Sequence, residues 1–226
     1  KPAAVAGGIQ QINLLDKFVE HVHSFIDIGA LRPLKIVADT ANGMGGLILP
    51  AAFNELPFEL EILYEELDGT FPNHPADPLQ PENLVDLQNR VIESNADVGL
   101  AFDGDADRVF LVDEKANLVS GSMTTALVAS AILESEGPGP ILHNLICSRA
   151  TVEAIEEAGG EPIRTRVGHS YIKAVMAETG AMFGGEHSGH YYFARNYGAD
   201  SGLIAALICL ERLSLDGGQL SSLIAP

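Results

Sequence analysis

Hydrophobic and polar residues in the first half of the chain follow the short periods of alternating helices and strands. Apolar residues recur at helical spacing between positions 12 and 28 and predict a first helix, which Pro33 ends. Two apolar runs around a short polar loop, at 98–102 and 109–112, predict a pair of strands. The pattern also predicts a strand at 34–38, a helix from Gly43 to about residue 56, a strand at 59–64, a proline-rich loop at 71–81 and a helix at 83–95.

The same alternation begins again after residues 117–122, where polar and small residues interrupt the pattern. Two successive series of strands and helices favour two consecutive α/β domains, each with a largely parallel mixed sheet sandwiched by helices. We expect these domains to comprise residues 1–119 and 120–226. The elements expected in the second are helices at 123–134, 149–158, 170–179 and 201–213, strands at 141–146 and 162–167, and two short strands either side of 185–189.

Composition narrows the class of partner. The 226 residues are 46% hydrophobic, enough to bury a core, and carry 31 acidic against 13 basic side chains for a net charge of −18. This balance argues against nucleic acid or an anionic membrane as partner, but a metal or a few local cations could still bind a small anion. The longest apolar run, 203–210, is far shorter than the ~20 residues of a membrane span. Two cysteines in apolar stretches and no apolar leader predict a cytoplasmic protein.

The loop between the paired strands carries three carboxylates. Asp103, Asp105 and Asp107 alternate with small residues, and side chains two positions apart in an extended backbone point the same way. Three converging carboxylates suit Mg²⁺, which prefers hard oxygen ligands, and Arg108 follows at once where it could hold a phosphate. An exposed acidic turn without a ligand explains the run equally well on local grounds. An EF-hand calcium loop does not, because it needs glycine where Arg108 stands.

A second constellation follows about eighty residues later, in the glycine-rich run at 185–190. Glu186, Ser188 and His190 alternate on one side, a set of groups suited to sugar hydroxyls, and His190 could transfer a proton near neutral pH. The alternative is a polar hairpin tip with solvated histidines. His169 lies where a strand gives way to a helix, a place that favours anions. A serine N-cap with surface cations accounts for that segment equally well.

Two further features have a structural interpretation. The run at 39–46 resembles a phosphate-cradling turn, but the glycine spacing of a dinucleotide-binding motif is absent, and a tight strand-to-helix turn explains it. His74 is interpreted as a residue of the proline-rich loop, and a role in lining the binding site stays open.

The motifs together resemble those of the α-D-phosphohexomutases. The acidic Asp-Gly-Asp-Ala-Asp-Arg loop at 103–108 and Gly-Glu-His-Ser-Gly-His at 185–190 occur in the family's order, with Val-Gly-His-Ser-Tyr-Ile-Lys at 167–173 between them. The resemblance includes the loop at 71–78 and covers essentially the whole chain, and the segments at 141–148 and 168–170 look most like bacterial phosphomannomutase/phosphoglucomutase. It implies an isomerase, an intramolecular phosphotransferase that interconverts hexose 1-phosphate and hexose 6-phosphate, of mannose or glucose. The reaction would pass through a phosphoserine and a bisphosphorylated sugar.

The resemblance also implies roles for the residues of both motifs. Asp103, Asp105 and Asp107 would bind Mg²⁺, and Arg108 would lie near the phosphoserine. Glu186 and Ser188 would contact sugar hydroxyls. His190 would transfer a proton, and His169 would contact phosphate or sugar.

One departure from the family concerns the phosphoryl donor. Such enzymes have four domains, and this chain resembles the second and third. No Thr-x-Ser-His-Asn-like phosphoserine loop occurs in the sequence, so we expect the chain alone to be inactive without the first and fourth domains as partners. Two alternatives remain: a Mg²⁺-dependent sugar-phosphate phosphatase with Asp103 and Asp105 as nucleophile and acid, and a non-catalytic module that binds sugar phosphate.

Overall fold

The computed structural model describes residues 7–224, which form two five-stranded sheets with flanking helices. The first sheet has the strand order β2-β1-β3-β4-β5, in which β1 pairs in parallel with β2 and β3 while the β3–β4 and β4–β5 pairs are antiparallel. Its elements and those around it are α1 (Leu15–His23), η1 (Ile28–Ala30), β1 (Leu34–Asp39), α2 (Gly45–Phe53), β2 (Phe58–Leu63), η2 (Pro81–Leu84), α3 (Val85–Ser94), β3 (Val98–Phe102), β4 (Val109–Asp113) and β5 (Leu118–Val119).

The second sheet repeats this plan. Its order is β10-β9-β8-β6-β7, with β6 parallel to β7 and β8 and the remaining two pairs antiparallel. The predicted class of two consecutive α/β domains with mixed sheets is thus confirmed. The elements are α4 (Gly121–Glu136), β6 (Pro140–Asn144), α5 (Arg149–Glu157), β7 (Glu161–Thr165), α6 (His169–Thr179), β8 (Phe183–Gly185), β9 (Tyr191–Phe193), η3 (Ala194–Asn196), β10 (Ala199–Asp200), α7 (Gly202–Asp216) and α8 (Leu220–Leu223).

Strand alternation divides the core into layers. In the first sheet Val37 and Ala101 belong to a cluster with Leu87 of α3, whereas Ile36 and Leu100 face the larger central core. In the second sheet the outer face packs on α6 through one cluster, and the inner face contributes to the same central core. Each sheet is therefore covered on both faces, which explains the continuous apolar runs of its central strands.

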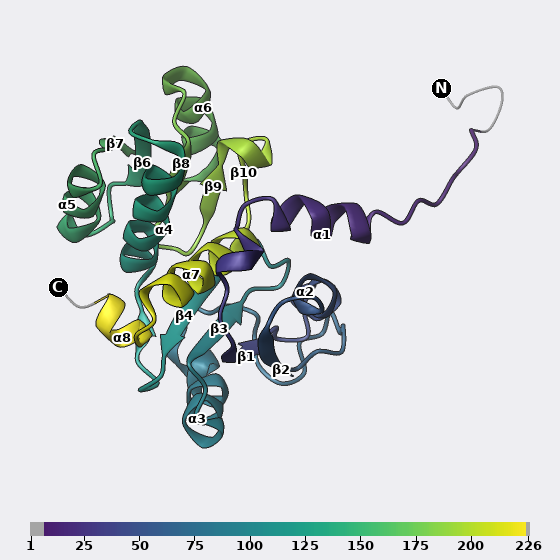
Figure 1. The fold of residues 1–226 in the computed structure, drawn as a ribbon. Helices are drawn as coiled ribbons and strands as arrows, with labels where there is room; N and C mark the ends of the chain where they lie inside the picture. The colour runs from purple at the N-terminus through teal and green to yellow at the C-terminus, as the bar shows by residue number, and fades with distance from the viewer. Residues whose placement is uncertain (1–6, 225–226) are drawn as a thin grey trace.

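Helix α7 lies between the two sheets and is shared by both (Figure 1). Every residue from Gly202 to Leu210 is buried, as expected of a helix surrounded by protein on all sides. It packs on β4 of the first sheet and on α4, which in turn contacts β8 of the second. The central core is consequently continuous across the two sheets.

This packing brings two loops together. The β3–β4 loop carries residues 103–108 and the β8–β9 loop carries residues 186–190, and an isolated antiparallel bridge joins Arg108 to His190. The N–H of Val109 donates to the carbonyl of Gly189 at 3.3 Å. A Cβ atom at Gly202, the first residue of α7, would lie 2.6 Å from the Arg108 backbone, so only glycine fits there.

The first helix is shorter than the sequence pattern predicts. It spans Leu15–His23 instead of 12–28, because the Asn13 side chain accepts the N–H of Leu15 before the first turn. At the other end, the Asp27 side chain accepts the N–H of Gly29 and starts the separate turn η1. The two-residue strands β5 and β10 were not expected, since two residues carry no periodic signal. In the part of the chain that the structure describes, no helix is long and apolar enough to cross a membrane.

A core substitution in α7 tests the shared packing. Leu207 is fully buried, and Leu207→Ala should lower the free energy of unfolding by about 2–5 kcal/mol because it leaves a cavity. Leu215 on the same helix is 61% exposed, and Leu215→Ala should change it by less than about 0.5 kcal/mol. Urea denaturation followed by circular dichroism measures both. Loss of stability in only one of two separate transitions would contradict a core shared by the sheets.

Candidate functional site

The acidic loop leaves β3 at the carboxyl end of that buried strand. Asp103 is 4% exposed, and its Oδ1 accepts the backbone N–H of Arg108 at 3.1 Å while its Oδ2 accepts Nε of Arg108 at 2.8 Å. Ala106 has a φ of 62°, which turns the loop back towards β4. One carboxylate oxygen from each of Asp103, Asp105 and Asp107 lies within 4.8 Å of the others, as the alternating sequence predicts.

The turn between β1 and α2 contacts the backbone of the acidic loop. It is the predicted strand-to-helix turn, since β1 ends at Asp39 and α2 begins at Gly45. The N–H of Met44 donates to the carbonyl of Gly104 at 2.9 Å, and a Cβ at Gly43 would lie 2.5 Å from that same oxygen. The approach of this turn to Gly104 was not predicted, and the glycine at position 43 is its only local signal in the sequence.

Burial and crowding of the carboxylates raise their pKa values. Desolvation, followed by the charges of Asp103 and Asp105, raises the pKa of Asp107 to about 7. Desolvation and the charge of Asp103 also raise the pKa of Asp105. The buried Oδ1 of Asp107 accepts no hydrogen bond from any residue in the described range 7–224. Converging oxygens with an unsatisfied buried acceptor fit a divalent cation, which would relieve both the repulsion and the missing bond.

Glu186 of the β8–β9 loop is held in place by hydrogen bonds from other segments. This residue is 2% exposed, and its Oε1 accepts from Nδ2 of Asn144 at 3.2 Å and from the N–H of Gly168 at 3.1 Å. Its Oε2 accepts the hydroxyl of Tyr192 at 2.9 Å. Three donors from three segments therefore fix the carboxylate in one orientation. Neither Asn144 nor Tyr192 was predicted; Tyr192 lies two residues beyond the motif and could have been considered, whereas Asn144 at the end of β6 has no local signal.

His190 ends the β8–β9 loop and faces the acidic loop. Its Nδ1 is 3.0 Å from the Ser188 hydroxyl oxygen and 3.8 Å from Oε2 of Glu186, and its Nε2 is 3.6 Å from Oδ1 of Asp107. Burial, which outweighs the opposing effect of Glu186, lowers the pKa of His190. A largely neutral imidazole near pH 7 can accept a proton from a hydroxyl group.

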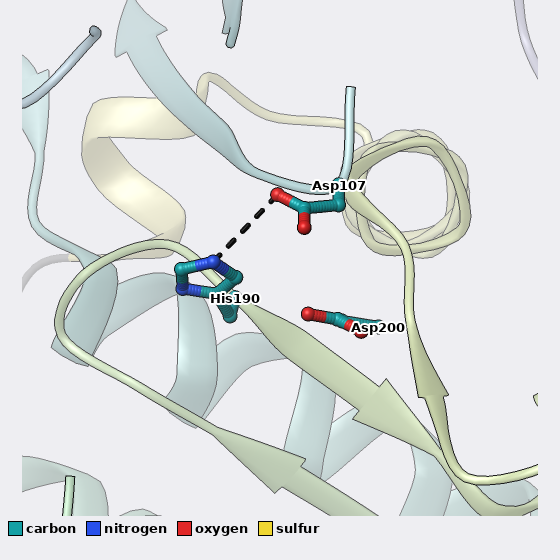
Figure 2. Close-up of side chains that lie close together, drawn as sticks. All are labelled: Asp107, His190 and Asp200. Atoms are coloured by element: carbon teal, nitrogen blue, oxygen red, sulfur yellow. Dashed lines mark ion pairs between the residues drawn. The ribbon is translucent and has the colours of Figure 1, made fainter. Parts of the chain in front are cut away.

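Asp200 joins this group from β10. Figure 2 shows the side chains of Asp107, His190 and Asp200 turned towards one another, with the 3.6 Å contact between the first two as a dashed line. Ligand atoms of the three lie within 4.8 Å of each other. Nζ of Lys173 is 3.1 Å from Oδ1 of Asp200 and already balances its charge, so this trio is better suited to orienting His190 than to binding a cation.

The remaining predicted residues differ in placement. Arg108 faces Asp103 and also approaches Oδ1 of Asp77 through Nη1 at 3.4 Å, a contact that the sequence did not suggest. His169 is the exposed first residue of α6, and its side chain forms no hydrogen bond or ion pair with another of residues 7–224. The N–H of its neighbour Gly168 donates to Glu186, so the backbone at this position adjoins the site while the imidazole of His169 has no hydrogen bond to it. Contacts join the other seven predicted site residues into one group.

Comparison with known proteins places this arrangement in a family. Residues 16–117 match the model of phosphoglucomutase/phosphomannomutase alpha/beta/alpha domain II, and residues 120–226 match that of domain III. Phosphomannomutase of Escherichia coli K12 is 40% identical over 223 residues, which are 96% of this chain and 49% of that protein. Phosphomannomutase/phosphoglucomutase of Pseudomonas aeruginosa PAO1 is 39% identical over 95% of this chain and 46% of its own length. The chain thus spans about half the length of these curated relatives.

Solved structures agree. A phosphoglucomutase/phosphomannomutase family protein from Burkholderia thailandensis superposes with a TM-score of 0.86 at 37% identity, over 95% of this chain and 46% of that one. The Aspergillus fumigatus N-acetylphosphoglucosamine mutase, solved with GlcNAc-6P and magnesium, shares the fold alone, with a TM-score of 0.64 and 16% identity over 91% of this chain and 50% of that one. Since both domain models match in order along nearly the whole chain, the chain belongs to the phosphoglucomutase/phosphomannomutase family and carries its domains II and III.

Proposed function

We propose that this chain supplies the metal loop and the sugar loop of a phosphohexomutase that interconverts the 1- and 6-phosphates of mannose or glucose. The observation that carries the proposal is the convergence of the two loops, joined by the Arg108–His190 bridge and by the 3.6 Å contact of His190 with Asp107. A metal site and a polar site for a sugar then adjoin each other. In this proposal residues 1–119 form the metal-binding domain and residues 120–226 the sugar-binding domain.

In the proposed site Asp103, Asp105 and Asp107 hold Mg²⁺. Bound there, the ion would neutralise charge on a transferring phosphoryl group. The raised pKa values of Asp105 and Asp107 and the unsatisfied Oδ1 of Asp107 support a cation at this position. The magnesium named with the Aspergillus structure agrees with this choice of ion for the fold. Arg108 keeps guanidinium donors beyond those used by Asp103 and Asp77 with which to contact a phosphate.

The sugar loop has the complementary role. Glu186, fixed by three hydrogen bonds, accepts from sugar hydroxyls, and the Ser188 hydroxyl can donate or accept. His190, held near Asp107 and neutral near pH 7, accepts the proton of the hydroxyl that receives the phosphate and returns it in the reverse transfer. The side chain of His169 is exposed at the start of α6, so it is free to contact the phosphate or the sugar of a bound ligand.

The phosphoryl donor in this proposal is a phosphoserine, and the intermediate is a bisphosphorylated sugar. The 226 residues contain no Thr-x-Ser-His-Asn-like loop, and the relatives are about twice as long, so the donor and a further phosphate contact would come from first and fourth domains. We assign the enzyme to the cytoplasm, where both cysteines can stay reduced, as the free thiols of Cys147 and Cys209 are.

A phosphatase with Asp103 as nucleophile is less well supported. Asp103 is 4% exposed, and both of its oxygens accept hydrogen bonds from Arg108. A carboxylate so engaged is poorly placed to attack phosphorus. The arrangement therefore favours the mutase over this alternative.

Removal of one proposed ligand tests the metal assignment. Asp107→Asn should weaken Mg²⁺ binding to the 226-residue chain by at least about tenfold, whereas Asp16→Asn, an equal loss of charge on exposed α1, should leave it unchanged. Because the pKa of Asp107 is about 7, its proton competes with the metal, so wild-type affinity should fall between pH 8 and pH 6. Isothermal titration calorimetry measures both effects. Equal Mg²⁺ affinity in the two variants would overturn the assignment.

Turnover tests the reaction. The chain extended by its first and fourth domains should convert mannose 1-phosphate or glucose 1-phosphate to the 6-phosphate when primed with glucose 1,6-bisphosphate. Asp105→Asn should lower kcat/KM by at least about a hundredfold, as expected when a cation that stabilises the transferring group is lost. The 226-residue chain alone should show no turnover, because it lacks the phosphoryl donor.

Other outcomes of this assay separate the alternatives. Release of inorganic phosphate at the rate of substrate loss would indicate the phosphatase. Binding of hexose phosphate without turnover in the extended chain would indicate a non-catalytic module. A variant Asp105→Asn as active as the wild type would exclude the metal loop from the chemistry.

A further inference from the structure

His74, whose role the sequence left open, lies in the loop between β2 and η2 and pairs with a buried carboxylate. Its Nε2 is 3.0 Å from Oδ2 of Asp39, and its Nδ1 is 2.9 Å from the carbonyl oxygen of Pro75. The side chains of His74 and Asp39 are 14% and 3% exposed. Neither residue belongs to the metal or sugar motif.

The two contacts fix the protonation state of the ring. A carbonyl oxygen accepts hydrogen bonds only, so Nδ1 must carry a proton, and an ionised carboxylate accepts only, so Nε2 must carry one as well. Oδ1 of Asp39 accepts the N–H of Ala41 at 2.9 Å, which leaves Oδ2 to accept from Nε2 of His74. A neutral imidazole has one donor and would leave one of these contacts unmade. The hydrogen bond to Asp39 also raises the pKa of His74.

The groups around His74 support a positive charge on the ring. Asp39 faces it from the end of β1. The ring of Tyr64, directly after β2, meets it edge-on with centroids 5.4 Å apart. Tyr64 donates its hydroxyl to Asp86 of α3 at 2.6 Å, a bond that raises the pKa of Tyr64 to about 12 and keeps it neutral. Within residues 7–224, the ionisable groups around His74 are thus the carboxylates of Asp39 and Asp86 and the neutral phenol of Tyr64, with Asp77 further along its own loop.

The loop that His74 anchors contacts the acidic loop at both of its ends. The Phe71 ring lies against Gly104, where an added Cβ would be 3.3 Å from Cζ. Asp77 reaches Nη1 of Arg108, whose Nε binds Asp103. Between these ends, Nδ2 of Asn73 donates to Oδ1 of Asn42 at 2.7 Å, in the same turn that supports Gly104.

We propose that His74 is a positioning residue, held as an imidazolium by Asp39, whose ion pair keeps residues 71–77 in place against the acidic loop and Arg108. Removal of the ring charge frees the middle of this segment, and the contacts of Phe71 and Asp77 loosen with it. The effect on metal binding rests on the proposed function, whereas the protonation state of His74 does not.

Nitrogen-15 NMR of the 226-residue chain labelled at histidine tests the protonation state without metal. We expect one imidazole, assigned by its loss in His74→Gln, to carry protons on both nitrogens at pH 7.5 and to titrate above the roughly 6.5 of an unperturbed histidine. In Asp39→Asn that titration should move down. A single neutral tautomer for His74 at pH 7.5 would overturn the proposal, whatever the chain proves to catalyse.

The positioning role has separate readouts. In His74→Gln the backbone amide signals of Gly104 and Arg108 should shift, and Mg²⁺ affinity should fall about three- to tenfold, as for coupled neighbours. Wild-type affinity should also decline at alkaline pH as His74 loses its proton, and this decline should be absent from the variant. His21→Gln, whose ring binds Asn196 outside both loops, is the control.

These readouts distinguish the ways in which the inference can fail. A folded His74→Gln with wild-type amide signals at Gly104 and Arg108 contradicts the positioning role. Wild-type protein that binds no Mg²⁺ contradicts the proposed metal site instead, and the amide shifts still decide the role of His74.

Discussion

The burial of α7 between the two sheets is the constraint on which the site depends. Helix α7 packs on β4 of the first sheet and on α4, which covers β8 of the second, so the two halves cannot separate without exposing the central core. The helix begins at Gly202 directly on the backbone of Arg108, which sets how closely the second half approaches the acidic loop. A hydrophobic requirement of the fold thereby fixes the distance between two polar loops that lie about eighty residues apart in sequence.

The polar groups so assembled are not arranged for stability. At the end of β3, burial and then repulsion between the crowded carboxylates raise the pKa of Asp107 to about 7. Arg108 forms a close ion pair with Asp103 and offsets its charge. Asp105 and Asp107 have no comparably close cationic partner in the described chain. Such a cluster is costly without a cation, and the rigid core around it supplies the stability that the loop itself does not.

Sequence reasoning succeeded where a signal was local. Strands β3 and β4 are short continuous apolar runs on either side of a polar loop, and the alternation of Asp103, Asp105 and Asp107 follows from two-residue spacing in extended backbone. The loop ends of these strands could therefore be assigned chemistry before the fold was known. The predicted bounds of the first helix, 12–28, were wrong. The side chains of Asn13 and Asp27 accept backbone N–H groups near its two ends, an effect that the pattern of apolar residues does not reveal.

Contacts between distant segments could not be predicted in this way. Asn144 is 42 residues from Glu186, and Asp39 is 35 residues from His74, yet each pair shares a hydrogen bond. Nothing in the spacing of these residues indicates which strand ends will be neighbours, since that depends on the sheet orders. Residues such as Asn144 and Asp39, which hold other side chains in place, are thus found only from the structure. The residues that would bind the ligand can be recognised in the sequence.

This division has a physical cause. A neutral sugar is distinguished by directional hydrogen bonds, which need fixed partners, and Glu186 is buried with three donors already in place. A cation or a phosphate is attracted by charge at longer range, and the groups that would meet it, Asp105 and His169, are exposed. Preorganisation is therefore concentrated at Glu186 in the proposed sugar loop and at the His74–Asp39 pair, whose loop contacts the acidic loop. The charged ligands themselves would order the exposed groups that bind them.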